Sequence, residues 1–136
     1  MLAERRKQNM EKELEGHVAR LTALGGGSGN SKNIYEDWAS TYEENLQEDY
    51  GYIAPRIAAD EFAANCSNRD LRILDLGCGT GLVGKELIAR GFHVIDGLDY
   101  SPSMLAEAEK KGIYRNLLEG DMTQPLNLNG PCYDAA

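Results

Sequence analysis

The feature that most limits what this chain can fold into is the stretch ILDLGCGTGLVGKELIARG, residues 73–91, where a short apolar run meets four glycines within eight positions. The run before the glycines predicts a buried strand, and LVGKELIARG predicts a helix that Gly91 ends. A strand, a glycine-rich turn and a helix in this order are typical of α/β proteins that bind a nucleotide at the turn.

The segments after Gly91 continue the alternation of strand and helix. FHVIDGLD predicts a second strand, SPSMLAEAEKKG a second helix capped by Ser101, and IYRNLLEGD a third strand, while PCYDAA at 131–136 begins a fourth. Short connections between such elements predict a Rossmann-like, three-layer αβα fold with a parallel sheet in the order 3-2-1-4. Since three strands and a beginning do not complete such a sheet, we interpret the sequence as a fragment that lacks the C-terminal half of the fold.

Residues before the first strand divide into an extension and the start of the domain. Residues 1–24 predict an amphipathic helix, residues 25–33 a Gly/Ser linker, and residues 34–136 the N-terminal half of the domain. One helix is expected in NIYEDWASTYEENLQ, where Ile34, Trp38, Tyr42 and Leu46 share a face, and another in YIAPRIAADEFAANC.

Charge and composition limit the classes of partner that this chain is expected to bind. Residues 1–33 carry a net charge of +2 and residues 34–136 a net charge of −10. A body this acidic repels a phosphate backbone, so no nucleic acid is expected as a partner. No apolar run is long enough for a membrane span and no targeting segment is evident, which predicts a cytoplasmic protein without a membrane partner. The scattered cysteines and histidines predict no metal site.

The glycine-rich turn matches three nucleotide-binding patterns. The P-loop pattern G-x-x-x-x-G-K fails because Glu86 follows Lys85, where a hydroxyl should bind magnesium. The dinucleotide pattern G-x-G-x-x-G is met by Gly79, Gly81 and Gly84, with Asp99 about twenty residues on. Asp75 counts against it, because a carboxylate beside a pyrophosphate is repulsive.

The third pattern, D-x-G-x-G-x-G, makes use of Asp75. S-adenosylmethionine carries an ammonium and a sulfonium and no phosphate, so an acid at the turn favours it. Asp99, after the second strand, would accept hydrogen bonds from the ribose hydroxyls. Asp121, after the third strand, would accept one from the adenine amino group, and the Met122 backbone N–H would donate to a nitrogen of the adenine ring. Each aspartate taken alone could equally be a turn residue. Three acids at three strand ends favour S-adenosylmethionine.

The motifs ILDLGCGTG, GLDYSPSML, LEGDM and YDAA resemble those of the class I S-adenosylmethionine-dependent methyltransferases. The resemblance covers about residues 34–136 and implies that the cofactor S-adenosyl-L-methionine lies on the loop. The residues it implies in cofactor binding are Asp75, Gly77, Cys78, Gly79, Gly81, Asp99, Tyr100, Met104, Asp121 and Met122. It also implies that the helix bearing Tyr35, Trp38 and Tyr42 covers the pocket, although core packing explains these aromatics equally well.

The predicted function is methyl transfer by direct displacement, with a small molecule or a protein as the acceptor and no catalytic residue assigned. Two alternatives stay open: a non-catalytic S-adenosylmethionine-binding or interaction module, and an NAD-dependent oxidoreductase. The oligomeric state is not predicted.

Overall fold

The computed structural model describes residues 1–24, 31–50, 52–128 and 132–136, without the side chains of residues 47–50. Its contacts divide the chain into two compact units, Met1–Tyr52 and Ile53–Ala136. Most of the predicted linker lies outside the described residues, and its last residues, from Ser31, are already helical. Among the described residues, no helix combines the length and the apolar character that a membrane span requires.

The first unit consists of α1 (Leu2–Ala23), α2 (Ser31–Trp38) and α3 (Tyr42–Tyr50). The predicted amphipathic helix therefore forms and packs on both shorter helices, and its buried residues are Leu14 and His17. The single helix expected from residue 33 onward is wrong, because the chain turns after Trp38 and starts α3 at Tyr42. The turn lets the Trp38 indole N–H donate to the buried Asn45 Oδ1 at 2.8 Å. In one straight helix those residues would stand about 10 Å apart along the axis.

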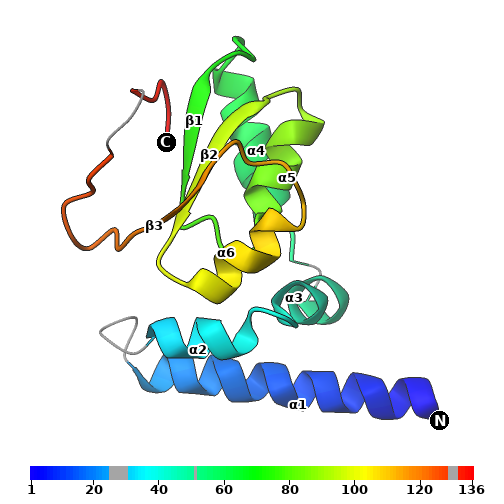
Figure 1. Cartoon of the computed structure of the whole chain (residues 1–136). Coiled ribbons are helices and arrows are strands. Elements are labelled where there is room, and N and C mark those ends of the chain that lie inside the picture. Colours follow the sequence, from blue (N-terminus) through cyan, green and yellow to red (C-terminus); the bar gives the residue numbers. More distant parts are fainter. Residues whose placement is uncertain (25–30, 51, 129–131) are drawn as a thin grey trace. The chain divides into compact units, whose positions relative to one another are not determined.

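The second unit contains α4 (Ala54–Asn65), β1 (Arg72–Leu76), α5 (Leu82–Ala89), β2 (Val94–Asp99), α6 (Pro102–Glu109) and β3 (Leu117–Glu119). β1 pairs with β2 and β2 with β3, all parallel. Ala135 forms a parallel bridge to Ile73, so the start of a fourth strand lies on the other side of β1. The strands lie side by side with the C-terminal segment next to β1 (Figure 1), and the predicted strand order is confirmed.

The core of this unit lies between the sheet and two helices. Buried side chains from α4, β1, α5 and β2, with Phe92 from the turn before β2, make one apolar cluster: Ala59, Ile73, Leu87, Phe92 and Ile95. Phe92 is fully buried and meets Phe62 edge-on, with ring centroids 5.1 Å apart. This layer fixes β1 and α5, and with them the glycine-rich turn that connects them.

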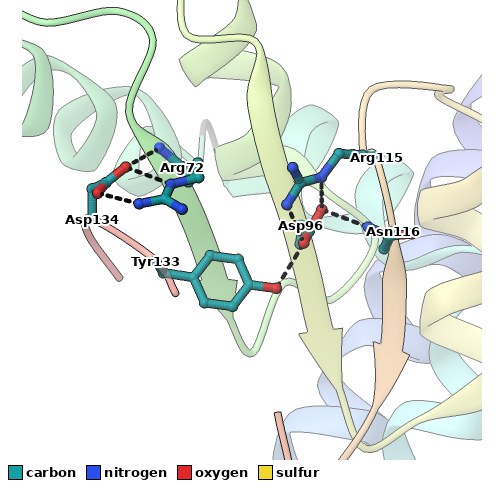
Figure 2. Close-up of polar contacts among 6 residues, drawn as sticks. All are labelled: Arg72, Asp96, Arg115, Asn116, Tyr133 and Asp134. Atoms are coloured by element: carbon teal, nitrogen blue, oxygen red, sulfur yellow. Dashed lines mark hydrogen bonds and ion pairs between the residues drawn. The ribbon is translucent and has the colours of Figure 1, made fainter. Parts of the chain in front are cut away.

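A network of polar side chains connects β1, β2 and the C-terminal segment (Figure 2). Asp96, which is 2% exposed in mid-β2, accepts hydrogen bonds from Arg115, Asn116 and Tyr133. Burial opposes ionisation of Asp96, but these hydrogen bonds outweigh it and lower its pKa. Beside it, Asp134 binds the backbone N–H and the guanidinium of Arg72. The network fastens the C-terminal segment to β1 and β2.

Candidate functional site

The glycine loop folds over the carboxyl end of β2. The φ angle is positive at three glycines of the loop: 70° at Gly77, 54° at Gly79 and 94° at Gly81. Residues with a Cβ rarely adopt such values. The amides of Gly77 and Cys78 donate to the Leu98 carbonyl at 2.8 and 2.9 Å. An added Cβ at Gly79 would meet nothing within 4 Å, so the space over the middle of the loop is open to a ligand.

Asp99 stands at the mouth of this loop, where the sequence places it. The residue is 7% exposed, and its carboxylate accepts from the Gly79 amide and from the Ser101 amide, each at 2.9 Å. A carboxylate oxygen accepts more than one hydrogen bond, so these contacts orient the group and leave lone pairs for ligand hydroxyls. The geometry suits a ribose.

Asp75 lies in β1 just before the loop and is half-buried. Its carboxylate accepts from the Tyr114 hydroxyl at 2.7 Å. Burial raises the pKa of Asp75, the Tyr114 hydrogen bond opposes this, and the Asp99 charge adds to it. Two carboxylates therefore lie close to the glycine loop, and their charge suits a cationic ligand better than a pyrophosphate.

Cys78 is part of the loop, and its thiol is unreactive. The thiol is buried, and burial together with the neighbouring Asp75 and Asp99 charges raises its pKa far above the usual range. A thiol that does not ionise is a poor nucleophile, so Cys78 contributes its small size and its backbone amide.

The remaining predicted cofactor residues surround the loop in different ways. Met122 is exposed, and its Cε lies 3.1 Å from the position of a Cβ added at Gly77. Asp121 accepts hydrogen bonds from the amide and the hydroxyl of Thr123. This is the turn role that the sequence analysis gives as the alternative to an adenine contact. Tyr100 is half-buried, and Met104 is buried at the start of α6, where its amide donates to the Ser101 hydroxyl.

The aromatic residues predicted to cover the pocket belong to the first unit. Trp38 is 3% exposed, stacks on His17 with centroids 5.1 Å apart, and meets Tyr35 and Tyr42. They form the core packing that was the alternative explanation for these aromatics, and their role over the cofactor stays a prediction.

Two residues of the site were missed by the sequence analysis. Tyr114 binds Asp75, and the Lys111 ammonium donates to the Thr80 carbonyl at 2.7 Å. Both lie in the segment between α6 and β3, more than thirty residues from their partners in the loop. A trace in the sequence is a glycine such as Gly84, whose missing side chain leaves room for the Tyr114 ring.

A cavity of about 610 Å³ lies beside α6 and β3, lined by residues that include Leu105, Glu109 and Asn116. No residue of the glycine loop lines it. Tyr114 does, and it also donates to Asp75. We place the candidate site at the loop, because the open glycine backbone and the oriented Asp99 are there.

Comparisons with known proteins agree with this geometry. A family model described as a methyltransferase domain matches residues 73–136. The structure resembles that of a TehB-like SAM-dependent methyltransferase from Corynebacterium glutamicum, with a TM-score of 0.57, 25% identity, and coverage of 75% of this chain and 54% of that one. The Rossmann-like fold and the resemblance to S-adenosylmethionine-dependent methyltransferases are confirmed.

In sequence, the chain is similar to methyltransferase-like protein 27 of Homo sapiens. The two are 39% identical over a match that covers 62% of this chain and 35% of that protein. The 18S rRNA (guanine(1575)-N(7))-methyltransferase of Saccharomyces cerevisiae is 44% identical over 47% of this chain and 23% of its own length. The chain thus spans about a third or less of these relatives.

The exclusion of nucleic acid as a partner is wrong. Several relatives are named 18S rRNA methyltransferases, so a domain of this kind is compatible with a nucleic acid substrate. The net charge of −10 was counted over a stretch that matches less than a quarter of such a relative. The charge of that stretch therefore does not exclude a nucleic acid substrate.

Proposed function

We propose that this chain binds S-adenosyl-L-methionine at the glycine loop and provides the cofactor-binding part of a methyltransferase. The observation that carries the proposal is the Asp99 carboxylate, held by the Gly79 amide beside an open glycine backbone. The matching family model and the named relatives support the same class. The predicted cytoplasmic location stays a prediction from the sequence.

The charges and the contacts of the loop favour this ligand over a dinucleotide. A pyrophosphate would lie next to both Asp75 and Asp99, whereas an ammonium gains from them. The third glycine of the dinucleotide pattern, Gly84, faces the Tyr114 ring. It therefore serves packing inside the protein.

Each residue near the loop has a defined task in this proposal. Asp99 would accept from the ribose hydroxyls, and Asp75 would supply negative charge behind the amino-acid part of the ligand. Tyr100, Met104, Asp121 and Met122 would surround the adenine. The bound cofactor supplies the methyl group on its sulfonium. The protein contributes orientation, because direct displacement is accelerated mainly by alignment of the reacting atoms.

Calorimetry with S-adenosylhomocysteine tests the proposal. We expect the full chain to bind S-adenosylhomocysteine and not NAD, and Asp99→Ala to weaken binding by roughly 10- to 100-fold, since a charged hydrogen-bond acceptor is lost. Asp70→Ala is the matched control, because Asp70 is exposed just before β1, at the opposite end of the strand.

Binding of NAD, or equal binding of S-adenosylhomocysteine by wild type and Asp99→Ala, would contradict the proposal. Failure of a folded wild-type chain to bind S-adenosylhomocysteine would contradict it as well.

A further inference from the structure

The Tyr114 ring fills a slot that only glycines can form. A Cβ added at Gly84 would lie 2.6 Å from Tyr114 Cζ, one at Gly81 3.0 Å from Cε2, and one at Gly97 3.1 Å from Cδ1. These glycines come from α5, the loop and β2 respectively. Three glycines on three elements thus bring one aromatic ring to the back of the glycine loop.

The slot aims the Tyr114 hydroxyl at a single acceptor. That acceptor is Asp75 Oδ2, at 2.7 Å. Burial and the Asp75 charge both raise the pKa of Tyr114, so the hydroxyl stays protonated and always donates. The other titratable groups near Asp75 are Asp99 at the end of β2 and the Cys78 thiol of the loop, and neither is a cation.

A second contact from the same segment holds the loop. The Lys111 ammonium donates to the Thr80 carbonyl at 2.7 Å, one residue before Gly81. The segment between α6 and β3 therefore fastens the loop at its carbonyl backbone and at the carboxylate that precedes it. Neither contact occupies the open space over Gly79.

We propose that Tyr114 is a positioning residue of the cofactor site, which acts by holding the Asp75 carboxylate behind the glycine loop. The inference rests on the proposed function, because it concerns how Asp75 serves a cationic ligand. A buried carboxylate next to Asp99 is held against protonation by its hydrogen-bond donors. Tyr114 is the side-chain donor.

The substitution Tyr114→Phe keeps the ring in its slot and removes only the donor. We expect it to weaken S-adenosylhomocysteine binding about tenfold at pH 7. Without the donor the Asp75 pKa rises, so protonation sets in at a higher pH and binding falls off earlier as the solution is acidified. Calorimetry between pH 5.5 and 8 measures both effects.

The matched control is Tyr133→Phe. Tyr133 donates to the buried Asp96 at 2.6 Å, so this substitution also deletes one tyrosine hydroxyl bound to a carboxylate of β2, away from the loop. We expect it to lower stability and to leave the affinity and its pH profile unchanged.

A double-substitution cycle separates positioning from packing. If Tyr114 acts through Asp75, then Tyr114→Phe has no further effect on binding in an Asp75→Asn background, and the pH dependence disappears. Equal losses in both backgrounds would overturn the inference. So would a Tyr114→Phe chain that binds with wild-type affinity and pH profile.

A measurement without cofactor keeps this inference distinct from the proposed function. Carbon-detected NMR follows the titration of the Asp75 carboxyl group in the free protein. We expect its midpoint to lie higher in Tyr114→Phe than in wild type. An unchanged midpoint would overturn the role of Tyr114 even if S-adenosylhomocysteine did not bind, whereas that failure of binding would contradict the proposed function.

Discussion

The two helical glycines Gly16 and Gly84 show that the same residue type serves different needs at different positions. Gly16 lies in mid-α1, is exposed, and has open space where a Cβ would be. Gly84 is buried in α5 against the Tyr114 ring. An added methyl group therefore has opposite consequences at the two positions.

We expect Gly16→Ala to stabilise the first unit by up to about 1 kcal/mol, because alanine favours a helix over glycine. Gly84→Ala should destabilise the second unit by about 1–3 kcal/mol, because the methyl group overlaps a ring that cannot withdraw. Denaturant unfolding followed by circular dichroism measures both, and Trp38 fluorescence reports on the first unit. A Gly84→Ala chain as stable as wild type would contradict the packing described for Tyr114.

Individual elements show how far the sequence specified the fold. Gly91 follows the end of α5 with a φ of 92°, and Ser101 caps α6, both as predicted. Such signals are local, because they depend on one residue's own backbone or a neighbour within a turn.

The wrong predictions concern contacts between different elements. Trp38 in α2 donates to Asn45 in α3 across the break between these helices, and the Tyr114 contact spans 39 residues. β3 was predicted from residue 113 and starts only at Leu117, after the side chains that bind Asp75 and Asp96. Helical periodicity and apolar runs carry no information on such pairs.

An ion pair with a defined pH range is one of the contacts that hold the start of the fourth strand. Arg72 lowers the pKa of Asp134 to about 2 through side-chain and backbone hydrogen bonds. Since this folded pKa lies below the unfolded value of 3.8, the stabilisation is complete above about pH 5 and is lost as the pH falls towards 2.

We therefore expect wild type to be more stable than Asp134→Asn by a constant amount above pH 5 and by a smaller amount at pH 3. Denaturant midpoints at several pH values measure this difference, with the exposed Asp70→Asn as a control. A difference between wild type and Asp134→Asn that does not change with pH would show that the Arg72 contact does not anchor the segment.

The aromatic cluster of the first unit contains a built-in probe for cofactor binding. Trp38 is the single tryptophan of the chain and is buried. Its fluorescence therefore reports on the predicted role of Tyr35, Trp38 and Tyr42 as a pocket cover.

If these aromatics cover the cofactor, S-adenosylhomocysteine should change the Trp38 emission and raise the unfolding midpoint of both units. At a ligand concentration of about 100 times Kd the linkage gain is about 2.7 kcal/mol. If the ligand stabilises only the second unit and leaves the Trp38 emission unchanged, the predicted role as a pocket cover is wrong. The aromatics then serve only the packing of the first unit.

Amide NMR tests residue by residue whether the glycine loop holds an S-adenosyl amino acid, which carries an ammonium group and no phosphate. Titration of the labelled chain with S-adenosylhomocysteine should shift the amide signals of Gly77, Gly79, Tyr100 and Met122, while NAD at the same concentration should leave them in place. Shifts confined to the cavity beside α6 and β3, or shifts at the loop with NAD alone, would contradict the account.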